Sequence, residues 1–274
     1  MCTAIKYENY FGRNLDLWCH YDSSVVITRK DKVGNRYPIM GMATVINDYP
    51  LYFEGMNDHG LAMAGLNFPG NAFYHPLDKL KKNLAPYELI PYFIGNFSSV
   101  AEVREELKTV NILDRPFSEN LPLSPLHWMI SDRNESVVLE TTKEGMKIYD
   151  NPANILTNNP TFDIQCFNLR NYVNLSVYGK EGDYSLGMGA LGLPGDLSSM
   201  SRFVRGAFHT KNSPKGLGVN QLFHLLYSVA MPRGSVITPE GTDEYTQYTC
   251  CCDLVNNKYY YTEYDDLNVR CVDF

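Results

Sequence analysis

The order of strand-like and helix-like segments constrains the fold of this chain more than any other feature. Runs rich in β-branched and aromatic residues predict strands at 24–29, 41–46, 61–66, 126–131, 136–141, 247–252 and 258–264. The letters SDRNES separate the fourth run from the fifth and are typical of a turn, which predicts a hairpin that continues into 146–150.

Helical patterns lie between and after these strands, at 85–97, 99–110, 201–208 and 219–229. Ser99 and Glu102 have the spacing of a capping box, whereas Pro91 is unfavourable inside a helix. Strands and helices do not alternate, so we expect an α+β protein with two antiparallel sheets covered by helices, not a parallel βαβ sheet. No repeat or linker divides the sequence, which predicts a single domain over residues 1–274.

Charge and composition exclude some partners. The formal net charge of −7 disfavours nucleic acid or an anionic membrane as the main partner. No apolar run approaches the length of a membrane span, and the first residues lack the basic and apolar regions of a signal peptide. We therefore expect a cytoplasmic protein.

The seven cysteines do not indicate a disulfide framework, because the number is odd and the chain is long. Three of them are consecutive in QYTCCCDL, which reads as a strand whose thiols point to alternate faces. No CxxC pair or neighbouring histidine completes a tetrahedral metal site. We expect Cys250, Cys251 and Cys252 to be buried, unreactive thiols.

Cys2 differs from the other cysteines, because removal of Met1 would place a thiol and an α-amine on one residue. Their reference pKa values are about 8.5 and about 7.7–8.0. The amine can therefore act as the base for its own side chain, and the thiolate can act as the nucleophile. With Met1 in place the amine of Cys2 is blocked, and we expect little turnover.

Two charged residues follow in YFGRNLD. Arg13 could favour the thiolate of Cys2, and Asp16 could accept hydrogen bonds from the amine. Positions 13 and 16 face opposite ways on a regular strand. We expect the chain to bend between them if both are to meet Cys2.

Other polar residues are weaker candidates. Asparagine amides such as those of Asn67 and Asn158 can hold an oxyanion, but asparagine two residues before a proline is also common in turns. Arg202 could steady a thiolate or be a solvated helix residue. His127 and His224 lie in apolar runs, which predicts core positions, and neither HExxH nor a phosphate-binding glycine loop is present.

The motifs become specific in combination. In one order the chain contains MCTAI, YFGRNLD, NDHGLAMAGLNFPG, LSPLHWMISD, NPANILTNNPTFD, GLPGDLSSMSRFVR and YYYTEYDD. This set, spread over nearly the whole chain, resembles the choloylglycine hydrolase family and within it the bacterial bile salt hydrolases. The resemblance implies an N-terminal nucleophile hydrolase with a four-layer αββα sandwich, two antiparallel sheets flanked by helices.

The resemblance also implies an activity and a set of catalytic residues. The activity is hydrolysis of the amide that joins a bile acid to glycine or taurine, through a thioester and without metal or organic cofactor. Position by position, the family's functional residues match Cys2 as nucleophile together with Arg13, Asp16, Asn67, Asn158 and Arg202. Relatives are often tetramers, so the resemblance implies a homo-oligomer, with a tetramer as the expected form.

The steroid nucleus of such a substrate needs an apolar pocket. Candidates for its walls lie in or near the motifs: Leu17, Trp18, Phe53, Met56 and Phe68. Alternative functions are a penicillin V acylase or acyl-homoserine lactone acylase of the same family, and a non-enzymatic bile-salt-binding protein in which Cys2 is idle. A small molecule is the expected partner in every case.

Overall fold

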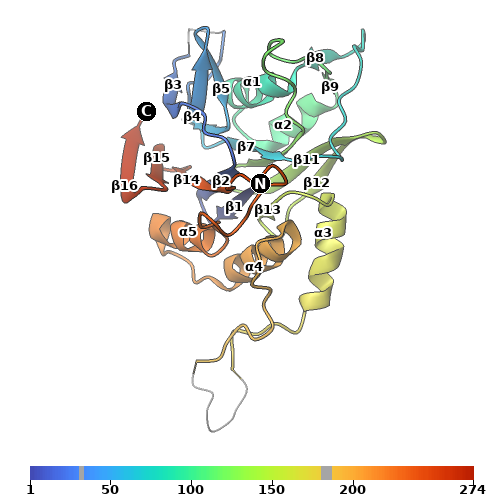
Figure 1. The fold of residues 1–274 in the computed structure, drawn as a ribbon. Coiled ribbons are helices and arrows are strands. Elements are labelled where there is room, and N and C mark those ends of the chain that lie inside the picture. Colours follow the sequence, from blue (N-terminus) through green and yellow to red (C-terminus); the bar gives the residue numbers. More distant parts are fainter. Residues whose placement is uncertain (31–33, 180–186) are drawn as a thin grey trace.

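The computed structural model describes residues 1–30, 34–179 and 187–274, and two sheets form its centre (Figure 1). Within these ranges the six-stranded sheet has the spatial order β13 (Ile155–Leu156), β1 (Cys2–Tyr7), β2 (Tyr10–Leu17), β14 (Tyr245–Asp253), β15 (Lys258–Glu263) and β16 (Asp266–Asp273). The eight-stranded sheet has the order β12 (Gly145–Asp150), β11 (Ser136–Thr142), β10 (Leu126–Ser131), β7 (Ala62–Asn67), β6 (Glu54–Asn57), β4 (Ile39–Ile46) and β3 (Ser23–Thr28), with β5 (Tyr49–Tyr52) also paired to β4. The neighbouring strands in both sheets are antiparallel, as predicted.

Helices cover the outer face of each sheet (Figure 1). The eight-stranded sheet is covered by α1 (Leu89–Asn96) and α2 (Val100–Leu107), and the six-stranded sheet by α4 (Ser199–Asn212) and α5 (Gly218–Tyr227). Beside α4 lies α3 (Phe162–Leu169), and a short parallel pair is formed by β8 (Lys82–Leu84) and β9 (Val110–Ile112). The arrangement is the four-layer αββα sandwich that the resemblance implied.

Strand alternation explains how one sheet can bound two cores. On β7, Ala62 and Ala64 pack between the sheets, while Met63 packs toward α1 and α2. On β10, Met129 faces the space between the sheets and Trp128 faces the helices. The predicted hairpin of β10 and β11 is confirmed, as is its continuation into β12.

The helix predictions are confirmed with local corrections. A 3₁₀ turn at Pro86–Glu88 precedes α1, so Pro91 falls in the first turn of α1, where its missing N–H removes no hydrogen bond. Helix α2 ends at Leu107, and Val110 belongs to β9. Ser99 caps α2 as expected, but the carboxylate of Glu102 accepts from Ser98, so the capping box is incomplete.

Among the remaining expectations, one core position was wrong, one helix was missed and the burial of the three consecutive cysteines is confirmed. His224 is exposed on α5, so its predicted core position is wrong: it lies on the face of α5 opposite the buried Leu222 and Leu226. The sequence patterns also missed α3, because its apolar residues form no single buried stripe: Phe162 is buried, whereas Ile164 and Phe167 are exposed. The cysteines of the TCCC run are buried on β14, as predicted, and burial raises the pKa of each well above its ordinary value.

No helix among the described residues is long and apolar enough to cross a membrane. No group of three or more His, Cys, Asp or Glu side chains in the described ranges is arranged to hold a metal ion.

Candidate active site

The first two strands carry the centre of the site, although neither was among the strand-like runs of the sequence. In the β1–β2 ladder Cys2 pairs with Leu15 and Ala4 pairs with Arg13. Alternation then directs the side chains of Cys2 and Arg13 to the same face, toward the eight-stranded sheet. Arg13 Nη2 donates a hydrogen bond to Cys2 Sγ over 2.6 Å, and Cys2 is only 2% exposed.

The eight-stranded sheet holds the Arg13 guanidinium in place. Its Nη1 donates to the carbonyls of Gly65, at 2.8 Å, and Phe53, at 3.0 Å. Burial by itself lowers the pKa of Arg13, but negative charge at Cys2 and Glu54 raises it above its ordinary value. Arg13 is therefore a fixed cation beside the sulfur, the arrangement that stabilises a thiolate.

The predicted bend between Arg13 and Asp16 is absent, because β2 runs unbroken through both. The irregularity lies across the ladder instead, in the β14 bulge between Thr246 and Tyr248. Asp16 points away from the sulfur and contacts the N-terminal residue through its backbone: its N–H donates to Met1 O at 3.0 Å, and the Met1 amine donates to Asp16 O at 2.6 Å.

The Asp16 carboxylate is fully buried, and one of its oxygens is unpaired. Oδ1 accepts from the hydroxyl of Thr246 at 2.6 Å, whereas Oδ2 has no hydrogen-bond partner among the described residues. Burial raises the pKa of Asp16, and the positive charges of Arg202 and the N-terminal amine oppose this rise. The Arg13 side chain thus contacts the Cys2 thiol from one face of β2, whereas the Asp16 side chain lies on the other face and only the backbone of Asp16 contacts the N-terminal residue.

Asn158 and Arg202 fix the main chain of Cys2. Asn158 Oδ1 accepts from the Cys2 N–H at 2.9 Å and from Arg202 Nη2 at 2.7 Å. Arg202 Nη1 donates to Cys2 O at 2.7 Å and to Thr3 Oγ1 at 2.6 Å. Arg202 is fully buried on α4, which excludes the solvated-helix interpretation. Burial lowers its pKa, against the opposing charges of Asp16 and Cys2.

The two predicted asparagines are neighbours in the fold. Asn67 ends β7, and its carbonyl accepts from Asn158 Nδ2 at 2.7 Å. This contact leaves the second Nδ2 hydrogen of Asn158 for another acceptor. The structure thus brings all six predicted catalytic residues around the beginning of β1.

The predicted pocket residues divide into two groups. Trp18 is 51% exposed, Leu17 is buried at the end of β2, and the half-buried Phe53 lies against Tyr21, with ring centroids 5.7 Å apart. The side chains of Met56 and Phe68 are fully buried. Both are as fully buried as Arg13, and their role as pocket walls stays a prediction.

A hollow of about 450 Å³ lies elsewhere, between β9 and β12, and none of the predicted site residues lines it. Its wall includes His75, Asp78, Asn111 and Met146.

One buried charge near the sulfur was missed by sequence reasoning. Glu54 begins β6, is fully buried, and its Oε2 lies 3.7 Å from Arg13 Nη1. The only signal in the sequence is a single acidic residue within the otherwise uncharged segment YPLYFEGMN.

The comparisons with known proteins agree with this geometry. Residues 2–274 match the family described as linear amide C–N hydrolases, choloylglycine hydrolase family. A bile salt hydrolase/transferase of Lactiplantibacillus plantarum is 47% identical, with 99% of this chain and 92% of that protein covered. A conjugated bile acid hydrolase of Lactobacillus acidophilus is 37% identical, with 98% and 95% covered.

Solved structures show the same likeness. The C2A mutant of the conjugated bile acid hydrolase from Clostridium perfringens superposes with a TM-score of 0.93 at 38% identity, covering 100% of this chain and 92% of that one. Penicillin V acylase from Agrobacterium tumefaciens shares the fold, with a TM-score of 0.79 at 20% identity over 100% of this chain and 86% of that one.

Two antiparallel sheets between helices, with a cysteine at the start of a central strand, define the N-terminal nucleophile hydrolase fold. Within that class the chain belongs to the choloylglycine hydrolase family and is a linear amide C–N hydrolase.

Proposed function

We propose that this chain hydrolyses the amide bond between a bile acid and glycine or taurine. The observation that carries the proposal is the contact of Arg13 Nη2 with Cys2 Sγ. The main chain of Cys2 is at the same time held by Asn158 and Arg202. The similar proteins of Lactiplantibacillus plantarum and Clostridium perfringens, named for bile salts or bile acids, support this substrate class.

The reaction begins after removal of Met1, when the α-amine of Cys2 takes the thiol proton. The Cys2 thiolate attacks the carbonyl carbon of the amide, and an S–C bond forms. The protonated amine then gives its proton to the departing glycine or taurine nitrogen as the C–N bond breaks. Water, deprotonated by the same amine, cleaves the thioester and releases the bile acid.

The tetrahedral oxyanion needs hydrogen-bond donors in fixed positions. The free Nδ2 hydrogen of Asn158 and the side-chain amide of Asn67 are the donors in this proposal. Asn158 is suited to the role because its Oδ1 is held by two donors, so the amide cannot rotate without losing both.

The surroundings of the terminal amine suit a base. In the structure burial lowers the pKa of the N-terminal amine, here that of Met1, against the raising influence of the Cys2 and Asp16 charges. A lowered amine pKa increases the fraction of free base at neutral pH. The unpaired Oδ2 of Asp16 is then available to the ammonium that forms during the reaction.

The test uses one preparation whose N-terminal residue is shown by mass spectrometry to be Cys2. Hydrolysis of glycocholate, taurocholate and penicillin V is compared through kcat/KM. We expect both bile salts to be cleaved at least about tenfold better than penicillin V, a difference of about 1.4 kcal/mol in transition-state stabilisation. A preference for penicillin V, or no cleavage of either bile salt, contradicts the proposal.

We also propose a homo-oligomer, with the tetramer as the expected form, and a cytoplasmic location. Light scattering coupled to size-exclusion chromatography tests the first, and fractionation of producing cells tests the second. A monomeric mass, or recovery of the protein outside the cytoplasmic fraction, contradicts them.

A further inference from the structure

The buried carboxylate of Glu54 links the two sheets behind the catalytic sulfur. Glu54 and Met56 share the face of β6 that looks toward the six-stranded sheet. Glu54 Oε2 accepts from the hydroxyl of Tyr248 and Oε1 from that of Tyr259, each at 2.6 Å. Oε1 also accepts from the Met42 N–H at 3.2 Å.

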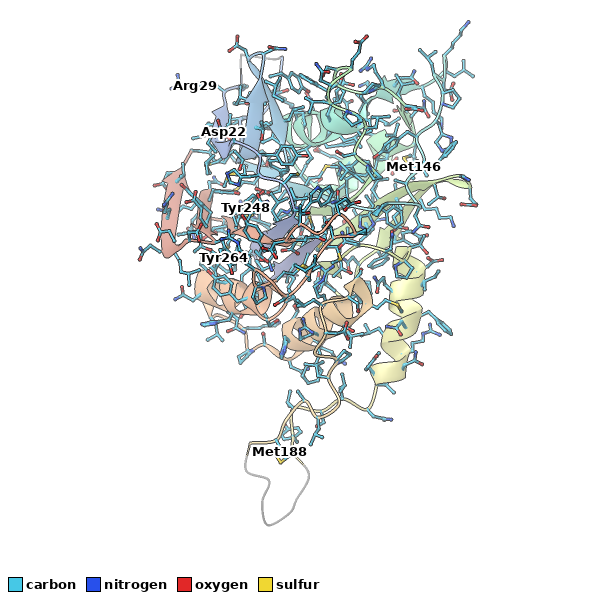
Figure 2. All side chains as sticks on the ribbon, viewed as in Figure 1. Asp22, Arg29, Met146, Met188, Tyr248 and Tyr264 are labelled. Atoms are coloured by element: carbon cyan, nitrogen blue, oxygen red, sulfur yellow. The ribbon has the colours of Figure 1, made fainter. Side chains whose placement is uncertain are left out.

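The two phenols are donors to this carboxylate and carry no charge themselves. Burial, with a further contribution from the Glu54 charge, raises the pKa of Tyr248 and of Tyr259 well above its ordinary value. Both hydroxyls therefore keep their protons. Tyr248, on β14, lies within the body of the molecule (Figure 2).

The link to the nucleophile runs through one guanidinium. Arg13 Nη2 donates to Cys2 Sγ, while Nη1 lies 3.7 Å from Glu54 Oε2. Because Arg13 has two further anchors in the carbonyls of Phe53 and Gly65, it does not need Glu54 to stay in place. The effect of Glu54 on the sulfur is thus chiefly one of charge.

Other charges surround Cys2. Several titratable or charged groups lie around Cys2 and the residues that contact it, and they come from different elements. They are Arg13 and Asp16 on β2, Glu54 on β6, Arg202 on α4, Tyr248 and Cys250 on β14, Tyr259 on β15, Glu244 in the loop before β14, and the terminal amine. Glu54 is the carboxylate of this set that lies beside Arg13.

We propose that Glu54 is a positioning residue that acts through Arg13, sharing its positive charge so that the Cys2 thiolate stays strongly nucleophilic. The proposal rests on Cys2 being the nucleophile of the proposed function. A thiolate stabilised by an unshared cation forms at lower pH but attacks more slowly, since nucleophilicity falls with thiol pKa.

The sign of the effect follows from Coulomb's law. Removing the negative charge of Glu54 favours the anionic thiolate, so the thiol titrates at lower pH. Removing the Tyr248 hydroxyl leaves the Glu54 charge less neutralised and pairs it more fully with Arg13, so the thiol titrates at higher pH. If Glu54 and Tyr248 had only structural roles, both substitutions would shift the pH at which the Cys2 thiol titrates in the same direction.

The experiment measures alkylation of processed protein by iodoacetamide as a function of pH. The N-terminal peptide is quantified by mass spectrometry, because the chain has other cysteines. In Glu54→Gln we expect the Cys2 profile to shift down by about one pH unit, and in Tyr248→Phe to shift up by about half a unit. Glu105→Gln, which removes an exposed charge on α2, is the matched control and leaves the profile in place.

Steady-state kinetics on glycocholate supply a second readout. In Glu54→Gln we expect kcat to fall about threefold at pH 8 with KM unchanged. Circular dichroism first establishes that each variant is folded. If Glu54→Gln does not fold, the Tyr248→Phe shift decides alone.

Superposition of the Glu54→Gln and wild-type alkylation profiles overturns the proposal, as does an upward shift, or a Tyr248→Phe profile that moves downward. Alkylation does not depend on turnover. The chain could cleave no bile salt and still show the expected shifts, downward in Glu54→Gln and upward in Tyr248→Phe. That result would refute the proposed function while supporting the role of Glu54.

Discussion

The two cores on either side of the eight-stranded sheet have different chemistry. The outer core, between this sheet and helices α1 and α2, consists mainly of apolar side chains such as Leu89, Phe93 and Val103. The inner region, between the sheets and around β1, buries Arg13 and Glu54 beside Cys2. The residues named in both regions are almost completely buried, so burial alone does not distinguish a stabilising core from a reactive one.

The two regions differ in the interactions that hold their residues in place. Apolar packing is non-directional and depends on area and volume. Buried charges cost desolvation energy and are tolerated only when each has its partners. The outer core therefore supports the fold, whereas the inner region holds reactive groups at some cost in stability.

The sharpest way to separate the two regions is to remove the Cys2 thiol, the proposed nucleophile. Cys2→Ser keeps the volume of the side chain but replaces the thiol with a far less acidic hydroxyl. We expect kcat on glycocholate to fall about 10⁴-fold, with the urea midpoint of unfolding within error of wild type. An unchanged rate would sink the catalytic assignment and favour a binding protein.

Retention of Met1 is expected to have the next largest effect. Two preparations are released from a cleavable N-terminal tag, one beginning at Cys2 and one at Met1. The second has a peptide nitrogen in place of the free amine, so we expect kcat at least about 10³ lower. Equal rates in the two preparations would show that the terminal amine takes no part.

A truncation in the outer core provides the contrasting case. Phe93→Ala removes a fully buried aromatic ring, and we expect the free energy of unfolding to drop by about 3 kcal/mol. The kcat per folded molecule and the pH profile of Cys2 alkylation should stay as in wild type. A shifted alkylation profile would mean that the two regions are coupled through the sheet.

The smallest predicted effect is a gain in stability when Asp16 is replaced by asparagine. Burial raises the pKa of Asp16 in the folded protein above its unfolded value, so stability from this group is present at low pH and is lost as pH rises through the folded pKa. In Asp16→Asn that loss disappears, and we expect the free energy of unfolding at pH 8 to rise by about 1 kcal/mol, with no rise at pH 3.

Urea unfolding at the two pH values checks this prediction, and activity should fall in the same variant, because the proposed mechanism uses the Asp16 charge to stabilise the ammonium that forms during the reaction. An equal change in stability at pH 3 and pH 8 would contradict the assignment of the cost to ionised Asp16.

Local patterns were sufficient for much of the framework. Alternation and β-branched residues located β10, β11, β14 and β15, and the motif around Ser99 located the start of α2. The same patterns missed β1 and β2, which are buried on both faces and include charged residues that argue against a core strand. That the chain is a single domain stays a prediction.

The sequence by itself determined the reactive residue types, since MCTAI and GRNLD already pair a thiol with a cation and a carboxylate. Only the tertiary structure decided that the Arg13 side chain contacts the sulfur, that the backbone of Asp16 contacts the terminal amine, and that Glu54 lies beside Arg13. The physical reason is distance: charges act on one another through space over a few ångströms, and residues 2, 13, 54, 158 and 202 become neighbours only when β1 pairs with β2 and the second sheet and α4 pack against them.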